Sequence, residues 1–175
     1  MPPPDAQTMG VACQGTAADD RLAAVGEFDA RWVCVGGGWM FSACAVAAKV
    51  LRPGIEVWGV EPEAGDDTKR SLEAGERITI AVPNTIADGQ GAETPGAVTF
   101  GVNRLLVDGV DLVSDAQLLE AMAFAFDRMK IVLEPSGATG LASVMFGQRP
   151  EAGARVGVIL SGGNVGLKHF QELMA

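Results

Sequence analysis

The sequence is poor in basic residues and in histidine. Its 13 Lys and Arg stand against 22 Asp and Glu, which gives a formal net charge of −9. Affinity for nucleic acid rests mostly on clustered Lys and Arg, so nucleic acid is not an expected partner. His169 is the single histidine, which excludes a zinc or iron site built on several histidines. We expect His169 itself to lie at the surface.

The sequence also lacks the usual signals of export and membrane insertion. Its three cysteines form no C-x-x-C pair, and an odd number suits reduced thiols. No basic residue and no early apolar run precede Arg21, so we expect no signal peptide and a cytoplasmic location. The segment 32–48 carries no charge, but Gly36, Gly37 and Gly38 interrupt it. A buried strand, a tight turn and a buried helix explain this run better than a membrane span does.

Glycine is in excess, at 23 of 175 residues, and apolar residues make up 48% of the chain. That composition suits one folded domain. Short apolar strands alternate with helices, which predicts an α/β fold with a mostly parallel sheet. The capping-box sequence Ser114-Asp115-Ala116-Gln117 predicts the start of a long helix, with Met122, Phe126 and Met129 in the core. We predict strands at 32–35, 56–60, 110–113 and 155–160, and helices at 16–26, 40–51, 68–73, 98–107, 115–129 and 136–146 and near the C-terminus.

Two glycine-rich turns follow predicted strands. Gly36-Gly37-Gly38 leads directly into a helix, and such a loop lets successive N–H groups and the helix N-terminus face an anion such as phosphate. A strand-to-helix connection that binds nothing is the alternative. No G-x-x-x-x-G-K-[ST] or G-x-G-x-x-G pattern fits, so ATP and NAD are not expected. The second turn, Ser161-Gly162-Gly163-Asn164, should lie at the same carboxyl-end edge of a parallel sheet. Ser161 could offer its hydroxyl to a ring nitrogen or serve only as a cap.

Six blocks of the chain, in order, resemble the pyridoxal-phosphate (PLP) enzymes of fold type II. They are similar to serine/threonine dehydratases, serine racemases and 3-hydroxyaspartate ammonia-lyases. The blocks are Gln14-Gly15-Thr16, Val35-Gly36-Gly37-Gly38, Val60-Glu61-Pro62, Thr85-Ile86-Ala87-Asp88-Gly89, Glu134-Pro135-Ser136-Gly137-Ala138 and Leu160-Ser161-Gly162-Gly163-Asn164. The resemblance implies a three-layer sandwich, the large domain of the tryptophan synthase beta-like fold. It also implies α,β-elimination of a small hydroxy-amino acid to a 2-oxo acid and ammonia, with racemisation left open.

The resemblance also implies a cofactor site. The residues implied to hold the PLP phosphate by their backbone are Gly36, Gly37, Gly38, Trp39 and Met40, while Ser161 meets the pyridine nitrogen. A neutral hydroxyl does not hold a proton on that nitrogen, so the ring is a weaker electron sink, which suits prompt loss of a β-substituent. Trp39 stands where the family normally has a fourth glycine. If that position needs a positive φ, the aromatic residue is strained and PLP binding is weakened.

The resemblance further implies a divalent cation, Mg²⁺ or Ca²⁺, bound by Glu61, the carbonyl of Gly65 and Asp67. The competing interpretation is that Asp66 and Asp67 only cap the helix that begins near Thr68. Two further acids stand in the matching blocks. We interpret Asp88 as a turn residue and Glu134 as a loop anchor or part of the cofactor wall, and neither as catalytic.

The chain departs from the family in one decisive respect. The family lysine that binds PLP covalently lies in an N-terminal Ser-x-Lys segment, and no such segment is present. The lysines of this chain stand outside the matching blocks: Lys49, Lys69, Lys130 and Lys168. We therefore assign no catalytic residue.

The matching blocks correspond to the second half of the family's sequence, without the small domain. We expect a fragment, a truncated product or one piece of a split enzyme, with apolar surface where further strands would pack. The complete enzyme is expected to be a homo-oligomer, such as a dimer. The alternatives are a non-catalytic homologue that binds phosphate, PLP or a partner subunit, and an unrelated phosphate-binding module.

Overall fold

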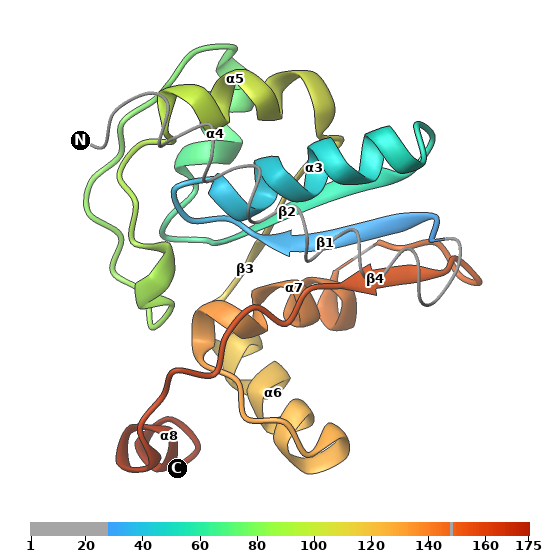
Figure 1. Cartoon of the computed structure of the whole chain (residues 1–175). Helices are drawn as coiled ribbons and strands as arrows, with labels where there is room; N and C mark the ends of the chain where they lie inside the picture. The colour runs from blue at the N-terminus through green and yellow to red at the C-terminus, as the bar shows by residue number, and fades with distance from the viewer. Residues whose placement is uncertain (1–27, 148) are drawn as a thin grey trace.

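The computed structural model describes residues 28–147 and 149–175, and it consists of a parallel sheet between two layers of helices (Figure 1). The sheet has four strands in the order β3-β2-β1-β4. Their bounds are β1 Ala30–Cys34, β2 Glu56–Pro62, β3 Gly109–Val113 and β4 Val156–Val158. Every neighbouring pair is parallel. The predicted α/β class and parallel sheet are therefore confirmed.

Helices cover both faces of this sheet. On one side, α3 (Trp39–Leu51) contacts β1 and β2, and packs against α5 (Ala97–Leu106). The short helix α4 (Asp67–Ala74) packs against α5 and β3. On the other side, α7 (Pro135–Phe146) contacts β1, β2 and β3, and α6 (Asp115–Phe124) packs against α7. The last helix, α8 (Leu167–Leu173), lies apart from the sheet beyond these layers (Figure 1). The three-layer arrangement is the predicted one.

The strands divide the core in two because successive strand residues point to opposite faces. Trp32, Trp58 and Val60 join the core on the α6 and α7 side. Val33 and Val57, which alternate with them, join the core under α3. Both faces of β1 and β2 are thus buried, as a run of apolar residues in a parallel sheet requires.

The helix predicted through Met129 changes its geometry before it ends. Its capping box is present: the Ser114 Oγ accepts from the Gln117 N–H at 3.3 Å, and the Gln117 Oε1 accepts from the Ser114 N–H at 2.9 Å. Residues Ala125–Met129 form a π-helical turn. Within this turn, the side chains of Phe126 and Met129 are 52% and 41% exposed. The prediction that both lie in the core is wrong.

The predicted helix at 16–26, the block Gln14-Gly15-Thr16 and Cys13 lie outside the described residues. Among the residues that are described, none of the helices combines the length and the apolar character needed to cross a membrane.

Candidate active site at the carboxyl end of the sheet

The two glycine-rich turns lie next to each other. Strands β1 and β4 are parallel neighbours, and each leads into one of the turns. Cys34 is the last residue of β1, and its Sγ lies 3.1 Å from the Ser161 Oγ of the second turn, although the two residues are far apart in sequence. The prediction that both turns share the carboxyl-end edge of the sheet is therefore confirmed.

The first turn presents free backbone donors. Gly38 is the N-cap of α3, no side chain caps that helix, and its first turn contains no acid. Within the described part of the chain, the amides of residues 36–40 donate to no acceptor. The N-terminus of a helix carries partial positive charge, and unpaired N–H groups need an acceptor. The loop therefore fits a phosphate, which would supply the missing oxygens.

The conformation of this turn removes the strain expected at Trp39. The positive φ, 87°, falls on Gly38, whereas Trp39 is the first residue of α3. The Trp39 ring instead lies beside Gly37, where an added Cβ would be 3.6 Å from the indole. Among the described residues other than glycine, Lys130 has a positive φ and Trp39 does not. The expectation that Trp39 weakens PLP binding through backbone strain loses its basis, because a glycine takes the left-handed position.

Helix α5 supports the loop from behind. The Thr99 Oγ1 donates to the Gly37 carbonyl at 3.0 Å, and the Ser42 Oγ donates to the Asn103 Oδ1 at 2.8 Å. A Cβ on Gly38 would lie 2.8 Å from the Thr99 Oγ1. Sequence reasoning missed these supports, because Thr99 and Asn103 stand in an ordinary amphipathic helix outside the matching blocks.

The block that begins at Glu134 joins the second turn to the block that ends at Gly89. The Glu134 N–H donates to the Gly162 carbonyl at 3.1 Å, and a Cβ on Gly162 would overlap the Glu134 carboxylate. The Ser136 Oγ accepts from the Gly89 N–H at 2.9 Å. The Asp88 Oδ1 also accepts from this N–H, at 2.8 Å. These contacts agree with Glu134 as a loop anchor and Asp88 as a turn residue, and Ser136 is a framework residue that the sequence reasoning did not single out.

Ser161 is exposed, while Cys34 is partly buried behind it. Burial raises the pKa of the Cys34 thiol, and its hydrogen bond with Ser161 opposes that rise. The thiol is thus neutral at neutral pH, and it can donate to or accept from the serine hydroxyl. The pair forms an uncharged polar spot beside the glycine turns.

A second feature lies where β2 ends, at the buried carboxylate of Glu61. Its two oxygens accept from the backbone N–H groups of Thr68 at 3.1 Å and Lys69 at 3.0 Å, in the first turn of α4. Asp66 makes no capping bond and instead accepts from the Arg70 Nε at 2.7 Å. The part of the alternative interpretation in which the Asp66 side chain caps this helix is therefore wrong, while Asp67 lies in the first turn, where an acid complements the helix dipole. Glu61 caps α4 from a distant strand.

Asp67 is buried beside Glu61, and its Oδ2 has no hydrogen-bond partner in the described part of the chain. Burial, and next the charge of Asp67, raise the pKa of Glu61 to about 8. Burial first, and then Asp66, raise the pKa of Asp67 to about 6. Two buried carboxylates without a cation are costly, so the pair fits a divalent cation. Gly65 is buried in the same turn.

No cluster of three or more His, Cys, Asp or Glu side chains that could hold a metal occurs in 28–147 and 149–175. A cation at Glu61 and Asp67 would therefore need other oxygen ligands, such as the Gly65 carbonyl and water.

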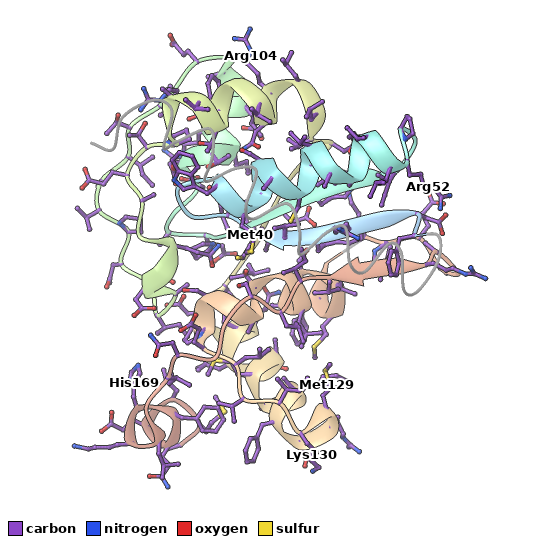
Figure 2. The ribbon with its side chains drawn as sticks, viewed as in Figure 1. Met40, Arg52, Arg104, Met129, Lys130 and His169 are labelled. Atoms are coloured by element: carbon purple, nitrogen blue, oxygen red, sulfur yellow. The ribbon has the colours of Figure 1, made fainter. Side chains whose placement is uncertain are left out.

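The lysines of the chain are engaged away from both turns. The Lys49 Nζ donates to the Ile55 carbonyl at 2.6 Å, and the Lys69 Nζ donates to the Val110 carbonyl at 3.0 Å. The Lys130 Nζ donates to the Asp127 carbonyl at 2.6 Å, and the exposed Lys168 pairs with Glu172. In Figure 2, Lys130 and His169 lie at the periphery, whereas Met40 lies near the middle of the molecule. His169 is exposed, as predicted.

An apolar hollow runs along the outer side of β4 and reaches Ser161, Gly162 and Gly163. Met129, Ile131 and Val132 line its far side. Buried Arg31 also borders it, and the Nη1 of this arginine has no hydrogen-bond partner among the described residues. Apolar side chains thus line a hollow beside β4, which is the edge strand of the described sheet.

Comparison with known proteins agrees with this geometry. The family model "Pyridoxal-phosphate dependent enzyme" matches residues 1–162. The L-threo-3-hydroxyaspartate ammonia-lyase of Saccharomyces cerevisiae is 42% identical over 165 residues, which are 94% of this chain and 51% of that protein. The serine racemase of Schizosaccharomyces pombe is 40% identical over 165 residues, with the same two shares.

Among solved structures, the threonine deaminase of T.th. superposes with a TM-score of 0.85 at 42% identity. The match covers 89% of this chain and 54% of that one. The chain spans about half the length of the curated relatives it matches. The family match, the sequence identity and the shared fold lead to one conclusion: the chain belongs to the pyridoxal-phosphate-dependent enzymes of fold type II.

Proposed function

We propose that this chain is the PLP-binding large-domain portion of an ammonia-lyase that acts on a small hydroxy-amino acid. The observation that carries the proposal is the adjacency of the two turns, fixed by the 3.1 Å contact between the Cys34 Sγ and the Ser161 Oγ. One turn offers unpaired amides for a phosphate, and the other offers a hydroxyl. PLP has an anionic phosphate and a ring nitrogen, which need those two groups.

In this proposal the amides of residues 36–40 bind the phosphate, and the Ser161 hydroxyl donates to the ring nitrogen. PLP supplies the electron sink that makes the Cα–H bond of an amino acid acidic. Because Ser161 is neutral, it leaves the ring nitrogen without a proton, which favours loss of a β-hydroxyl over prolonged storage of charge. Glu61, Asp67 and the Gly65 carbonyl hold Mg²⁺ or Ca²⁺ and stabilise the end of β2 and the start of α4.

The relatives support the proposed substrate class. Their names specify 3-hydroxyaspartate, serine and threonine as substrates, each of which carries a hydroxyl on the β-carbon. Elimination of that hydroxyl from such a substrate gives a 2-oxo acid and ammonia. The serine racemases among the relatives support racemisation as the second candidate reaction.

For this chain alone we expect no turnover. Lys49, Lys69 and Lys130 are each hydrogen bonded away from the turns, so PLP would bind without a covalent bond. The catalytic lysine and the small domain would come from polypeptide equivalent to the other half of the relatives, in a homodimeric complete enzyme. The hollow beside β4 supports this, and it equally supports a non-catalytic homologue that binds PLP and a partner subunit.

The test is titration of the purified chain with PLP, followed by absorbance and by quenching of tryptophan fluorescence. Gly37→Ala is the decisive variant, because its Cβ would meet only the Trp39 ring, at 3.6 Å, and should not disturb the fold. The variant keeps the amide N–H, but its methyl group hinders the close approach of a phosphate to the backbone, so we expect PLP binding to weaken at least about tenfold, or about 1.4 kcal/mol. Gly101→Ala is the matched control, since Gly101 is exposed and nothing lies within 4 Å of that Cβ. Equal PLP affinity in the two variants would refute the proposed phosphate site.

Borohydride reduction and peptide mapping test the lysines. No pyridoxyl adduct is expected on Lys49, Lys69, Lys130 or Lys168, and an adduct on any of them would refute the non-covalent mode. Release of ammonia from serine, threonine or 3-hydroxyaspartate above background would refute the expectation that the chain alone is inactive.

A further inference from the structure

Gln90 is a buried polar residue that joins the ends of two strands. It ends the short 3₁₀ helix η1 (Asp88–Gln90), and it is 2% exposed. Its Nε2 donates to the Val35 carbonyl at 2.7 Å and to the Val60 carbonyl at 2.8 Å. Both hydrogens of the amide are therefore used, and the orientation of the amide is fixed.

The other end of this amide has no hydrogen-bond partner. The Gln90 Oε1 is buried and accepts from no donor in the described part of the chain. An unsatisfied buried acceptor costs about 1–3 kcal/mol. An apolar side chain of the same length would fill the space without that cost. What glutamine adds at this position is therefore its pair of donor bonds.

The two carbonyls that Gln90 joins belong to the two sites described above. Val35 directly precedes Gly36, where the phosphate turn begins, and Val60 directly precedes Glu61, the buried carboxylate. The Val60 carbonyl also accepts from the Val35 N–H at 2.9 Å. Gln90 thus links the residue that precedes Glu61 to the residue that precedes Gly36.

The backbone beside Gln90 touches both sites as well. A Cβ on Gly36 would lie 2.8 Å from the Gly89 carbonyl oxygen. A Cβ on Gly65 would lie 3.4 Å from the Gln90 carbonyl oxygen. Residues 89 and 90 therefore fill the space between the phosphate turn and the turn before α4, and neither turn can shift without disturbing them.

We propose that Gln90 is a positioning residue that couples divalent-cation binding at Glu61 and Asp67 to anion binding at residues 36–40. This inference rests on the proposed function for the identity of the two ligands. A cation that draws the Glu61 carboxylate toward it fixes the end of β2, and Gln90 transmits that constraint to the carbonyl before Gly36. Coupling between two sites is reciprocal, so PLP strengthens cation binding by the same factor. A coupling at the lower end of the usual range corresponds to about a fivefold change in affinity.

The experiment measures the dissociation constant of PLP with EDTA and with saturating MgCl₂ in three forms of the chain. In the wild type we expect Mg²⁺ to strengthen PLP binding about fivefold. In Gln90→Met, which keeps the length of the side chain but loses both donors, we expect this ratio to fall to about one. Thr99→Val is the matched control, because it removes the 3.0 Å bond to the Gly37 carbonyl without touching the cation side. Thr99→Val should weaken PLP binding equally with and without Mg²⁺, so its ratio should stay at the wild-type value.

A second measurement needs no PLP. Titration of the ¹⁵N-labelled chain with MgCl₂ should shift the amide resonances of Gly36, Gly37 and Gly38 in the wild type and in Thr99→Val. The shifts should be absent in Gln90→Met, or in Gln90→Glu if the methionine variant does not fold. Glu at this position lacks the two donors when ionised.

The outcomes separate the two proposals. If PLP does not bind but Mg²⁺ still shifts the three glycine amides through Gln90, the proposed function fails and the coupling stands. If PLP binds with the same Mg²⁺ ratio in the wild type and in Gln90→Met, the coupling is overturned and the proposed function stands. Failure of Mg²⁺ to move the glycine amides of the wild type also overturns the coupling.

Discussion

Replacement of Gly38 by alanine tests the geometry of the phosphate turn most directly. Gly38 has φ 87°, a conformation that costs an L-residue such as alanine roughly 1–2 kcal/mol. An added Cβ would also lie 2.8 Å from the Thr99 Oγ1 and 2.9 Å from the Thr99 Cβ. Thr99 is fully buried and holds the Gly37 carbonyl, so it has little room to move. Such overpacking lowers the free energy of unfolding by about a further 1–3 kcal/mol.

The two effects together predict that Gly38→Ala lowers the free energy of unfolding by about 2–5 kcal/mol. The assay is urea unfolding followed by circular dichroism. With a slope of about 2 kcal/mol per molar urea, the midpoint should fall by roughly 1–2.5 M. The control is again Gly101→Ala in the middle of α5, where nothing lies within 4 Å of the added Cβ. That change should stabilise the chain by about 0.5–1 kcal/mol, because glycine is unfavourable within a helix.

A Gly38→Ala midpoint equal to that of the wild type would refute the reasoning. It would mean that α3 can begin without a residue in the left-handed conformation.

Three other predictions follow from individual groups. With EDTA present, the free energy of unfolding should fall as the pH rises from 4.5 toward 8. The reason is that the folded chain retains the Glu61 proton to about pH 8, whereas the unfolded chain does not. Urea unfolding at several pH values checks this, and Glu61→Gln should flatten the dependence of the unfolding free energy on pH. Iodoacetamide should label Cys34 more slowly than a free thiol, since burial raises the pKa of Cys34, and PLP should slow the labelling further. Peptide mapping measures the rate, and the same rate with and without PLP would place the cofactor elsewhere. Lys130→Gly should stabilise the chain by about 1 kcal/mol, because Lys130 has φ 61° after the π-helical turn, and an unchanged thermal midpoint would contradict that.

Much of the candidate site was predictable because its signals are local. Three glycines between an apolar strand and an uncharged helix start predict a turn with exposed amides wherever they occur in a parallel sheet. The second turn, with Ser161, follows by the same rule, and parallel strands bring both turns to one edge. The capping box at Ser114 was equally local and was found in the expected geometry.

The residues that the sequence reasoning missed act through contacts between distant segments. Gln90 joins strand ends from 55 and 30 residues away, and Thr99 reaches Gly37 across 62 residues. The N–H groups of Thr68 and Lys69 are capped by Glu61 rather than by the adjacent Asp66, because the end of β2 brings the Glu61 carboxylate under the first turn of α4. Local spacing could not distinguish these partners.

The sequence by itself determined the order of strands and helices, the position of the glycine turns and the family. The elements and turns could be predicted because apolar periodicity, caps and glycine freedom act within a few residues, whereas the family was implied by the resemblance of six sequence blocks. Only the tertiary structure decided which residue takes the left-handed position before α3, which acid caps α4 and what holds the two strand ends together. Those choices depend on burial and on hydrogen bonds between segments far apart in the chain, which exist only once the sheet has formed.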